Sequence, residues 1–344
     1  MPMPPLPLSA LLLIFALSLL ITLRAATWFT RTLEAISDMF DLSASMLSLL
    51  GALGANIPNY AASIVAIASD QFAVGLGIII GSNIYNVAII LAISTFATRS
   101  RQGITLTPKE ASDARLVAVY TLAIMLTTLA GVYLLSLLPS HLAGSTALFI
   151  TIVLIITNIL TLGFFAALSY HALHRVPHTE DVVTTTEETS QRKSPSSASI
   201  RTIGTALLAL GIALGGVVVM VQSGQAAATI VHMPPAILGL FVLAVATSLP
   251  NTVVAFTLAH TNRATACVEE VLSSNSINAT CGIALPLLIW HDTLHDQLLL
   301  FLDTPLMAAL TLVTLLCVMR GRVNHRVGFA LVGVYVVWIG VHLI

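Results

Sequence analysis

The chain has 344 residues, of which 57% are hydrophobic and only 8% are charged, and its formal net charge is −1. Soluble domains carry charge on about a quarter of their residues, so this composition excludes a soluble globular protein and predicts one embedded in a lipid bilayer. A charge balance so close to zero also offers no basic surface that would bind nucleic acid.

Ten stretches are apolar and long enough to cross a bilayer as helices, which takes about 17–25 residues. They lie at about 6–28, 43–69, 72–98, 115–137, 146–174, 201–222, 234–260, 264–290, 297–319 and 326–344. The first has no basic segment before it and no obvious cleavage site, so we interpret it as a retained span and not as a signal peptide. The sequence therefore predicts an all-α polytopic membrane protein with ten transmembrane helices.

The basic residues fall in every second connection between these spans. They are Arg24 and Arg31; Arg99, Arg101, Lys109 and Arg115; Arg175, Arg192, Lys193 and Arg201; Arg263; and Arg320, Arg322 and Arg326. Connections rich in Lys and Arg face the cytoplasm, so both termini are expected outside. We expect an integral protein of the cell (inner) membrane.

Five predicted spans precede the longest connection and five follow it. With an odd number of spans in each half, the second half enters the membrane in the opposite direction, which predicts two inverted five-helix repeats. The expected division is a first half at 1–174, a polar cytoplasmic linker at 175–200 and a second half at 201–344.

One stretch of sequence occurs in both halves. Residues 53–86 contain ANIPN and GSNIYN, and residues 245–278 contain TSLPN and SSNSIN. At a constant offset of 192 residues, the identical pairs are Pro58 and Pro250, Asn59 and Asn251, Ser82 and Ser274, Asn83 and Asn275, and Asn86 and Asn278. Polar identities inside apolar spans predict a single site built from both copies.

The two matched prolines lie in the middle of predicted spans. Proline lacks an amide donor and crowds the preceding turn, so Pro58 and Pro250 each predict a helix break. A packing kink is the alternative for either proline alone. Two breaks at matched positions favour a substrate site near the membrane midplane.

The repeated polar residues form two matched sets of oxygen-bearing side chains. The sets are Asn59, Ser82, Asn83 and Asn86, and Asn251, Ser274, Asn275 and Asn278. Ser and Asn spaced by four residues share one helical face. Amide and hydroxyl oxygens can replace the hydration shell of a hard cation, so we expect these residues to bind a cation. The alternative is that they only hold helices together, at about 1 kcal/mol per contact.

These motifs resemble the two repeats of the calcium/cation antiporter superfamily, which includes the sodium/calcium exchangers. The family's repeats read approximately G-T-S-L-P-E and then G-S-N-x-x-N or G-S-N-x-x-D, and this chain has GANIPN with GSNIYN and ATSLPN with SSNSIN. The resemblance covers the ten-span layout, the inverted repeat and both motifs. It implies a secondary antiporter that works by alternating access and moves Ca²⁺ or a related cation against Na⁺ or H⁺, with no cofactor besides the transported cations.

The sequence departs from the family pattern at the acidic positions. Asn59 and Asn251 stand where the family has a carboxylate after the proline, and Asn278 stands where an acid can close the second motif. The family's Thr-Ser pair, which the resemblance places in the site, is kept only in the second copy, as Thr247 and Ser248. An uncharged cage should bind calcium weakly, and none of its groups can carry a proton.

One carboxylate lies near the repeated residues. Glu270, Ser274 and Asn278 are spaced four and four, which puts Glu270 about two turns, or roughly 12 Å, from Asn278. Acids within spans are rare and usually functional, so we expect Glu270 to attract the cation or to carry a proton. The alternative is an interfacial ion pair with Arg263.

The sequence shows no arrangement of nucleophile and base that indicates an enzyme, and the expected partners are the lipid bilayer and small inorganic cations. Three functions stay open. The first is cation exchange that includes calcium. The second is exchange of monovalent or other cations, which the missing carboxylates favour. The third is a transport-silent relative that acts as a membrane binding or partner protein.

Overall fold

The computed structural model describes residues 6–40, 52–98, 100, 102–137, 145–174, 195–290, 294 and 296–344. The α-helices are α1 (Leu8–Phe40), α3 (Ile57–Ala68), α4 (Phe72–Tyr85), α5 (Ala92–Ala97), α6 (Pro108–Ser136), α7 (Ser145–His174), α8 (Pro195–Ile230), α9 (Pro235–Ile237), α10 (Ala244–His260), α11 (Ala264–Ala279), α12 (Thr304–Met319) and α13 (His325–Leu343). Wider π-helical turns form η1 (Asn86–Leu91), η2 (Leu238–Leu243), η3 (Thr280–Ala284) and η5 (Leu299–Asp303), and η4 (Pro286–Leu288) is a 3₁₀ turn. Two short strands, β1 (Ile104–Thr105) and β2 (Arg322–Val323), complete the described elements.

Nine helices in the described part of the chain are long and apolar enough to cross a membrane. The prediction of an all-α membrane protein is therefore confirmed. One predicted span, 43–69, is not among these nine. It begins outside the described residues and continues through a helical stretch at 52–55 into α3. This arrangement is consistent with a count of ten.

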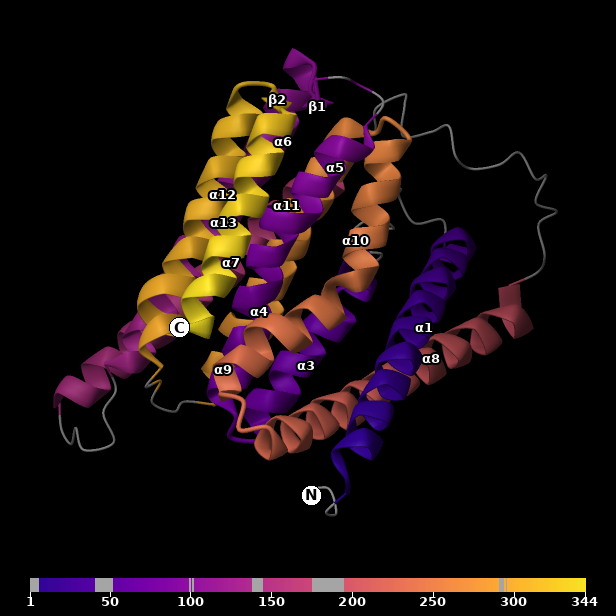
Figure 1. The fold of residues 1–344 in the computed structure, drawn as a ribbon. Helices are drawn as coiled ribbons and strands as arrows, with labels where there is room; N and C mark the ends of the chain where they lie inside the picture. The colour runs from indigo at the N-terminus through magenta and orange to yellow at the C-terminus, as the bar shows by residue number, and fades with distance from the viewer. Residues whose placement is uncertain are drawn as a thin grey trace.

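The two spans that carry the second half of each motif lie at the centre of the bundle (Figure 1). In the apolar 18-residue window of each span, 83% of the residues are buried for Phe72–Ala97 and 78% for Ala264–Leu288. The corresponding share is only 22% for the spans of α1, α7 and α13. A helix that is buried on all faces needs no polar stripe, so polar residues on these two spans require another explanation.

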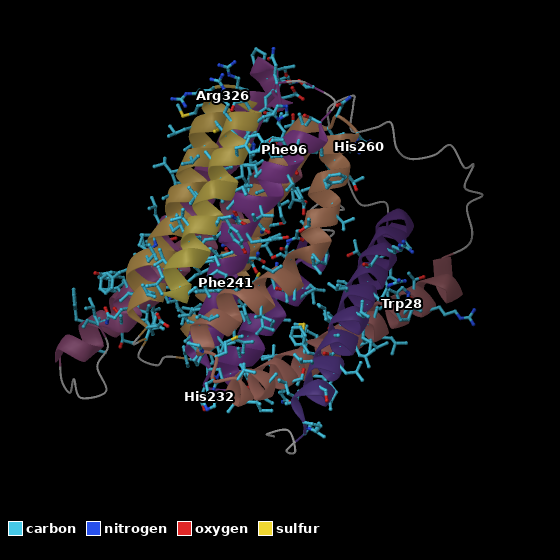
Figure 2. All side chains as sticks on the ribbon, viewed as in Figure 1. Trp28, Phe96, His232, Phe241, His260 and Arg326 are labelled. Atoms are coloured by element: carbon cyan, nitrogen blue, oxygen red, sulfur yellow. The ribbon has the colours of Figure 1, made fainter. Side chains whose placement is uncertain are left out.

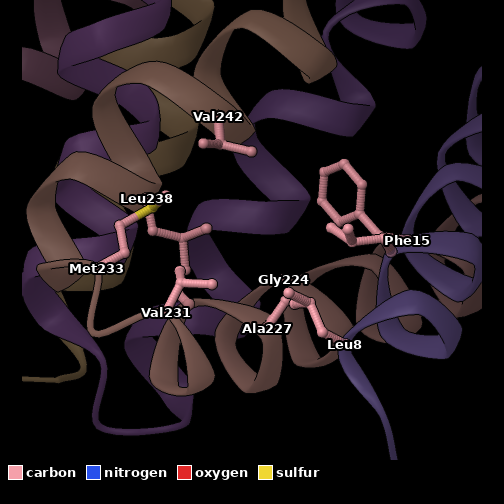
Figure 3. A pocket seen from close by; sticks show the side chains of 10 residues that line it. Leu8, Phe15, Gly224, Ala227, Val231, Met233, Leu238 and Val242 are labelled. Carbon is pink, nitrogen blue, oxygen red and sulfur yellow. The ribbon is translucent and has the colours of Figure 1, made fainter.

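The first helix and α8 pack against each other beside the remaining helices, as Figure 1 shows. A cavity of about 290 Å³ lies where this pair meets η2 (Figure 3). Its lining is wholly apolar and consists of Leu8, Leu12, Phe15, Gly224, Ala227, Ala228, Val231, Met233, Leu238 and Val242. A cavity without a polar side chain cannot replace the hydration shell of an ion, so the candidate site must lie elsewhere.

Helix α4 approaches η2 closely enough to require glycine on both sides. A Cβ atom on Gly81 would overlap the backbone of Leu240, and one on Gly239 would overlap the carbonyl of Val74. Small residues allow helix backbones in a membrane to come together in this way. The contact holds the span with the first Ser and Asn set against the span with the second proline.

Two of the connections predicted to be basic, those that contain β1 and β2, meet at one end of the molecule (Figure 1). Strands β1 and β2 pair antiparallel there, Thr105 opposite Arg322, and α6 begins beside them with a capping box in which Thr107 and Glu110 bond to each other's backbone. Arg326 lies at this end and His232 at the opposite end (Figure 2). The charge pattern predicts such a segregation, and the side of the membrane on which this end lies stays a prediction.

Candidate cation-binding site

The helical residues before Pro58 are interrupted two positions upstream of it, at Asn56. Asn56 (φ −90°, ψ 0°) separates the helical residues 52–55 from α3, and Pro58 lies in the first turn of α3, where its missing N–H has no helical partner to lose. The break turns the side chains of Asn56 and Asn59 into the interior, where both are fully buried.

The predicted break at Pro250 is wrong. Helix α10 runs through Pro250 without interruption from Ala244 to His260, and the irregular turns lie one helical turn or more upstream, in η2. A proline removes only one helical hydrogen bond, and neighbouring bonds and local widening of the helix can absorb the clash. The two copies of the motif therefore differ in backbone although they match in sequence.

Asn56 connects three spans by hydrogen bonds. Its Nδ2 donates to Ser274 Oγ at 3.1 Å, and its Oδ1 accepts from Asn251 Nδ2 at 2.8 Å and from Asn59 Nδ2 at 3.4 Å. Sequence reasoning left this residue out of the site. The sequence did contain a signal for it, because Asn56 lies at the offset of 192 from Ser248, which was predicted to belong to the site.

The predicted ligand Asn59 lies between the two halves of the chain. Its Oδ1 accepts from Ser82 Oγ at 3.3 Å and, more weakly, from Ser248 Oγ at 3.5 Å. Thr247 takes no part in this group, because its hydroxyl donates to Leu243 O of its own helix at 2.7 Å. Of the predicted Thr-Ser pair, only Ser248 thus bonds to the other half.

Helices α4 and α11 are joined by a reciprocal set of asparagine bonds. Asn83 Nδ2 donates to Asn275 O at 3.3 Å, and Asn275 Nδ2 donates to Asn83 O at 3.1 Å. Asn86 Nδ2 donates to Asn275 Oδ1 at 2.8 Å, and Asn278 Nδ2 donates to Asn83 Oδ1 at 3.2 Å. Each bond has a counterpart at the offset of 192, so Asn83 and Asn275 are occupied in holding the two central spans together.

Three of the six predicted amide ligands keep a free oxygen. Asn86 Oδ1, Asn251 Oδ1 and Asn278 Oδ1 are buried and have no hydrogen-bond partner among the described residues. A buried polar atom without a partner costs about 1–3 kcal/mol, and such atoms are rare in native proteins. A hard cation would use such oxygens as ligands, whereas the bonds between the helices leave them unused.

Glu270 is connected to the buried asparagines through the hydroxyl group of Ser274. Its Oε1 accepts from Ser274 Oγ at 3.2 Å, and Ser274 Oγ in turn accepts from Asn56 Nδ2. The residue is partly exposed. No group of three or more His, Cys, Asp or Glu that could hold a metal ion occurs in the described ranges, so neutral oxygens dominate the centre.

One buried acid lies outside the repeated motifs and was missed at the sequence level. Asp303 is fully buried between α12 and α13, within 3.1 Å of His342. Its signal in the sequence was weak, because it is a single acid near the end of a span and has no counterpart in a motif.

Comparison with known proteins places these observations in a family. The sequence model described as sodium/calcium exchanger protein matches residues 10–169 and 202–343. No curated protein matches the sequence. A solved structure of the sodium-calcium exchanger NCX_Mj, soaked with 100 mM Na⁺ and 10 mM Sr²⁺, is 18% identical with a TM-score of 0.61, covering 97% of this chain and 99% of that one. The structure of native YfkE is 16% identical with a TM-score of 0.66, covering 96% of this chain and 92% of that one. At these identities the likeness shows the fold.

Proposed function

Because the chain belongs to the sodium/calcium exchanger protein family, we propose that it is a secondary active cation antiporter that works by alternating access. The transported cation is Ca²⁺ or a related ion, and it moves against Na⁺ or H⁺. The observation that carries the proposal is the group of three buried, unpartnered amide oxygens contributed by both halves of the chain.

The proposed ligands are buried oxygens that both halves of the chain contribute. Asn86, Asn251 and Asn278 supply the free amide oxygens, and Asn59, Ser82, Ser248 and Ser274 complete the set. Thr247, Asn83 and Asn275 support the site by holding their helices. Glu270, which accepts a hydrogen bond from Ser274, supplies negative charge near these oxygens.

A second candidate is exchange of monovalent cations. Among the described residues, no carboxylate bonds directly to the amides Asn59, Asn86, Asn251 or Asn278. Calcium sites gain affinity from the number of charged ligands, whereas a monovalent ion needs less charge for its desolvation to be offset. The neutral centre therefore favours weak binding of Ca²⁺ relative to Na⁺ or K⁺.

Ion flux in sealed vesicles tests the proposal. The purified protein is reconstituted into liposomes, an outward Na⁺ gradient or a pH gradient is imposed, and uptake of ⁴⁵Ca²⁺ and ⁸⁶Rb⁺ is measured against protein-free liposomes. Gradient-driven uptake of calcium supports the first candidate, and uptake of the monovalent ion alone supports the second. Absence of flux under every gradient would contradict the transport function. It would favour the hypothesis that the protein is a transport-silent relative.

Substitution of a free oxygen connects the flux to the site. Asn251→Leu removes one unpartnered oxygen together with its bond to Asn56, and flux should fall at least about tenfold because each ligand is worth more than 1.4 kcal/mol. Asn158→Leu on α7 is the matched control, because it removes an asparagine that bonds to Leu154 O of its own helix. Equal loss in both variants would indicate a folding defect and would remove the site from the mechanism.

A further inference from the structure

Asp303 is the one acidic residue in the described ranges that is fully buried. It is the last residue of the π-helical segment η5 and the N-cap of α12. Burial of a charged carboxylate is costly unless a partner compensates it, so its surroundings must stabilise either the charge or a proton.

The surroundings of Asp303 contain one base and two aromatic rings. Trp338 Nε1 donates to Asp303 Oδ1 at 2.6 Å, and His342 Nε2 lies 3.1 Å from the same oxygen without the alignment of a hydrogen bond. Asp303 Oδ2 and His342 Nδ1 are both buried without a partner. Phe241 of η2 packs on both Trp338 and His342, with ring centroids 4.6 Å and 5.2 Å away.

A proton is the ligand that this pair of side chains can bind. An acid and an imidazole in contact share one proton and are then neutral overall, whereas without it they leave a buried negative charge. A metal ion would need at least one further donor, and no group of three acidic, His or Cys side chains occurs in the described ranges. Asp296, Tyr335, Tyr85 and Tyr133 are titratable groups on the neighbouring segments, and none of them is a cation. Arg320, His325 and Arg326 lie at the far ends of α12 and α13, and Cys317 lies in the last turn of α12.

Two short routes connect this pair to the amide centre. Met307 lies one helical turn beyond Asp303 on α12, and its sulfur is 3.4 Å from Asn83 Nδ2. Tyr335, which packs on Trp338, also packs on Tyr85, the residue directly before Asn86. A charge on Asp303 is thus close enough to the centre for its field to be felt there, since an ion pair about 10 Å apart is only partly screened inside a protein.

We propose that Asp303 and His342 form the proton-binding site of the exchanger, and that the proton leaves this pair when a cation enters the amide centre. The proton leaves Asp303 or His342 for water, no other bond is broken, and the negative charge that remains balances the bound cation. The side chain of His342 is only 3% exposed, but Leu343 and Ile344, which follow it, are exposed, so the pair lies close to the surface of the molecule. The inference rests on the proposed function, because it assigns the coupling ion that the neutral amides cannot carry.

Trp338 provides a direct reading of this site. The chain has three tryptophans, so Trp28→Phe with Trp290→Phe leaves Trp338 as the single indole. A protonated imidazole next to an indole quenches its fluorescence, so the emission of Trp338 should follow a single-proton titration curve. Asp303→Asn and His342→Gln should each abolish or displace that curve. His325→Gln is the matched control, because His325 stacks on Phe96 at the opposite end of α13 and its loss should leave the curve unchanged.

Coupling to the cation is tested by repeating the titration with NaCl or CaCl₂ in place of choline chloride at the same ionic strength. A unit charge about 10 Å away, at an effective dielectric constant of about 20, should move the midpoint by about one pH unit toward lower pH, and a divalent ion should move it further. In liposomes, Asp303→Asn should lose uptake driven by a pH gradient.

Three results would overturn the inference: emission of Trp338 that does not titrate, a curve that Asp303→Asn and His342→Gln leave intact, or a change that requires added Zn²⁺. A curve that no cation moves, in a protein that transports cations normally, would refute the coupling while the proposed function stands. Absence of all cation flux would refute the proposed function instead, whatever the titration shows.

Discussion

At the scale of single residues, the centre depends on the two ends of the asparagine side chain. Asn86 and Asn278 each use Nδ2 to bond to the opposite central helix and keep Oδ1 without a partner. An aspartate has no N–H to donate, so it could supply a ligand oxygen at these positions only by giving up the bond between helices. Under the proposed function, the uncharged motif therefore combines helix packing with the supply of ligand oxygens in one residue.

Restoring one carboxylate should increase the preference for calcium. Asn278→Asp adds a negative charge beside the free oxygens, and the calcium concentration for half-maximal uptake should fall about tenfold or more, because affinity rises with ligand charge. The lost bond to Asn83 should lower stability by about 1 kcal/mol. Asn262→Asp, in an exposed turn, adds the same charge away from the site and should change neither quantity. An unchanged calcium dependence in Asn278→Asp would show that this oxygen is not a ligand.

Removing the nearby charge should slow transport while the fold is kept. Glu270→Gln preserves an oxygen that can accept from Ser274 Oγ but removes the negative charge, so cation uptake should fall about tenfold with little change in thermal stability. Glu269→Gln is the matched control, since it makes the same change one position earlier, on another face of α11. Uptake at the level of the unmodified protein in Glu270→Gln would remove this residue from the mechanism.

At the scale of helices, the observed ends differ from the predicted spans in a regular way. Helix α1 continues to Phe40, α6 begins at Pro108 and α8 begins at Pro195, each several residues beyond the apolar stretch, and α8 thereby includes the last part of the predicted linker. Hydropathy marks the part of a helix that lies in lipid. The helix itself ends where caps or turns satisfy its last backbone groups, as the capping box at Thr107 does for α6.

Contact between α4 and η2 should be sensitive to a single methyl group. Gly81→Ala puts a Cβ atom into the backbone of Leu240, which cannot rotate away, so the unfolding temperature should fall by the equivalent of about 1–3 kcal/mol. Gly163→Ala on α7 meets nothing within 4 Å and should be neutral or stabilising by up to about 1 kcal/mol. Thermal unfolding in detergent, followed by size-exclusion chromatography, measures both, and equal behaviour of the two variants would contradict the close contact.

At the scale of the whole molecule, the polar bonds relate the two halves of the chain. Bonds between Asn83 and Asn275, and those from Asn86 and Asn278, repeat at the offset of 192 residues. This is the pattern expected when two similar halves face each other about a two-fold axis, and it is consistent with the predicted inverted repeat. The symmetry is incomplete around the prolines, where α3 starts at the break and α10 does not.

The predicted orientation is tested by the accessibility of cysteines. In a variant in which Cys267, Cys281 and Cys317 are replaced by alanine, a single cysteine at His232 should react with a membrane-impermeant maleimide added outside intact cells. A single cysteine at Arg322 should react only after permeabilisation. Both positions are exposed, His232 at one end of the molecule (Figure 2) and Arg322 in β2 at the other (Figure 1), so they form a matched pair. The reverse pattern would place both termini in the cytoplasm and contradict the orientation inferred from the basic residues.

Sequence alone predicted the class of protein, the approximate positions of the spans and most of the polar residues that bond to one another at the centre. Hydropathy and a repeat at a fixed offset depend only on the order of residues in the chain, so both can be recognised from the sequence. Tertiary structure alone decided that Asn56 joins three spans, that α10 continues through Pro250 and that Asp303 meets His342 across 39 positions of the chain. Hydrogen bonds form only within about 3.5 Å and in narrow directions, and those distances arise only when helices from both halves have packed.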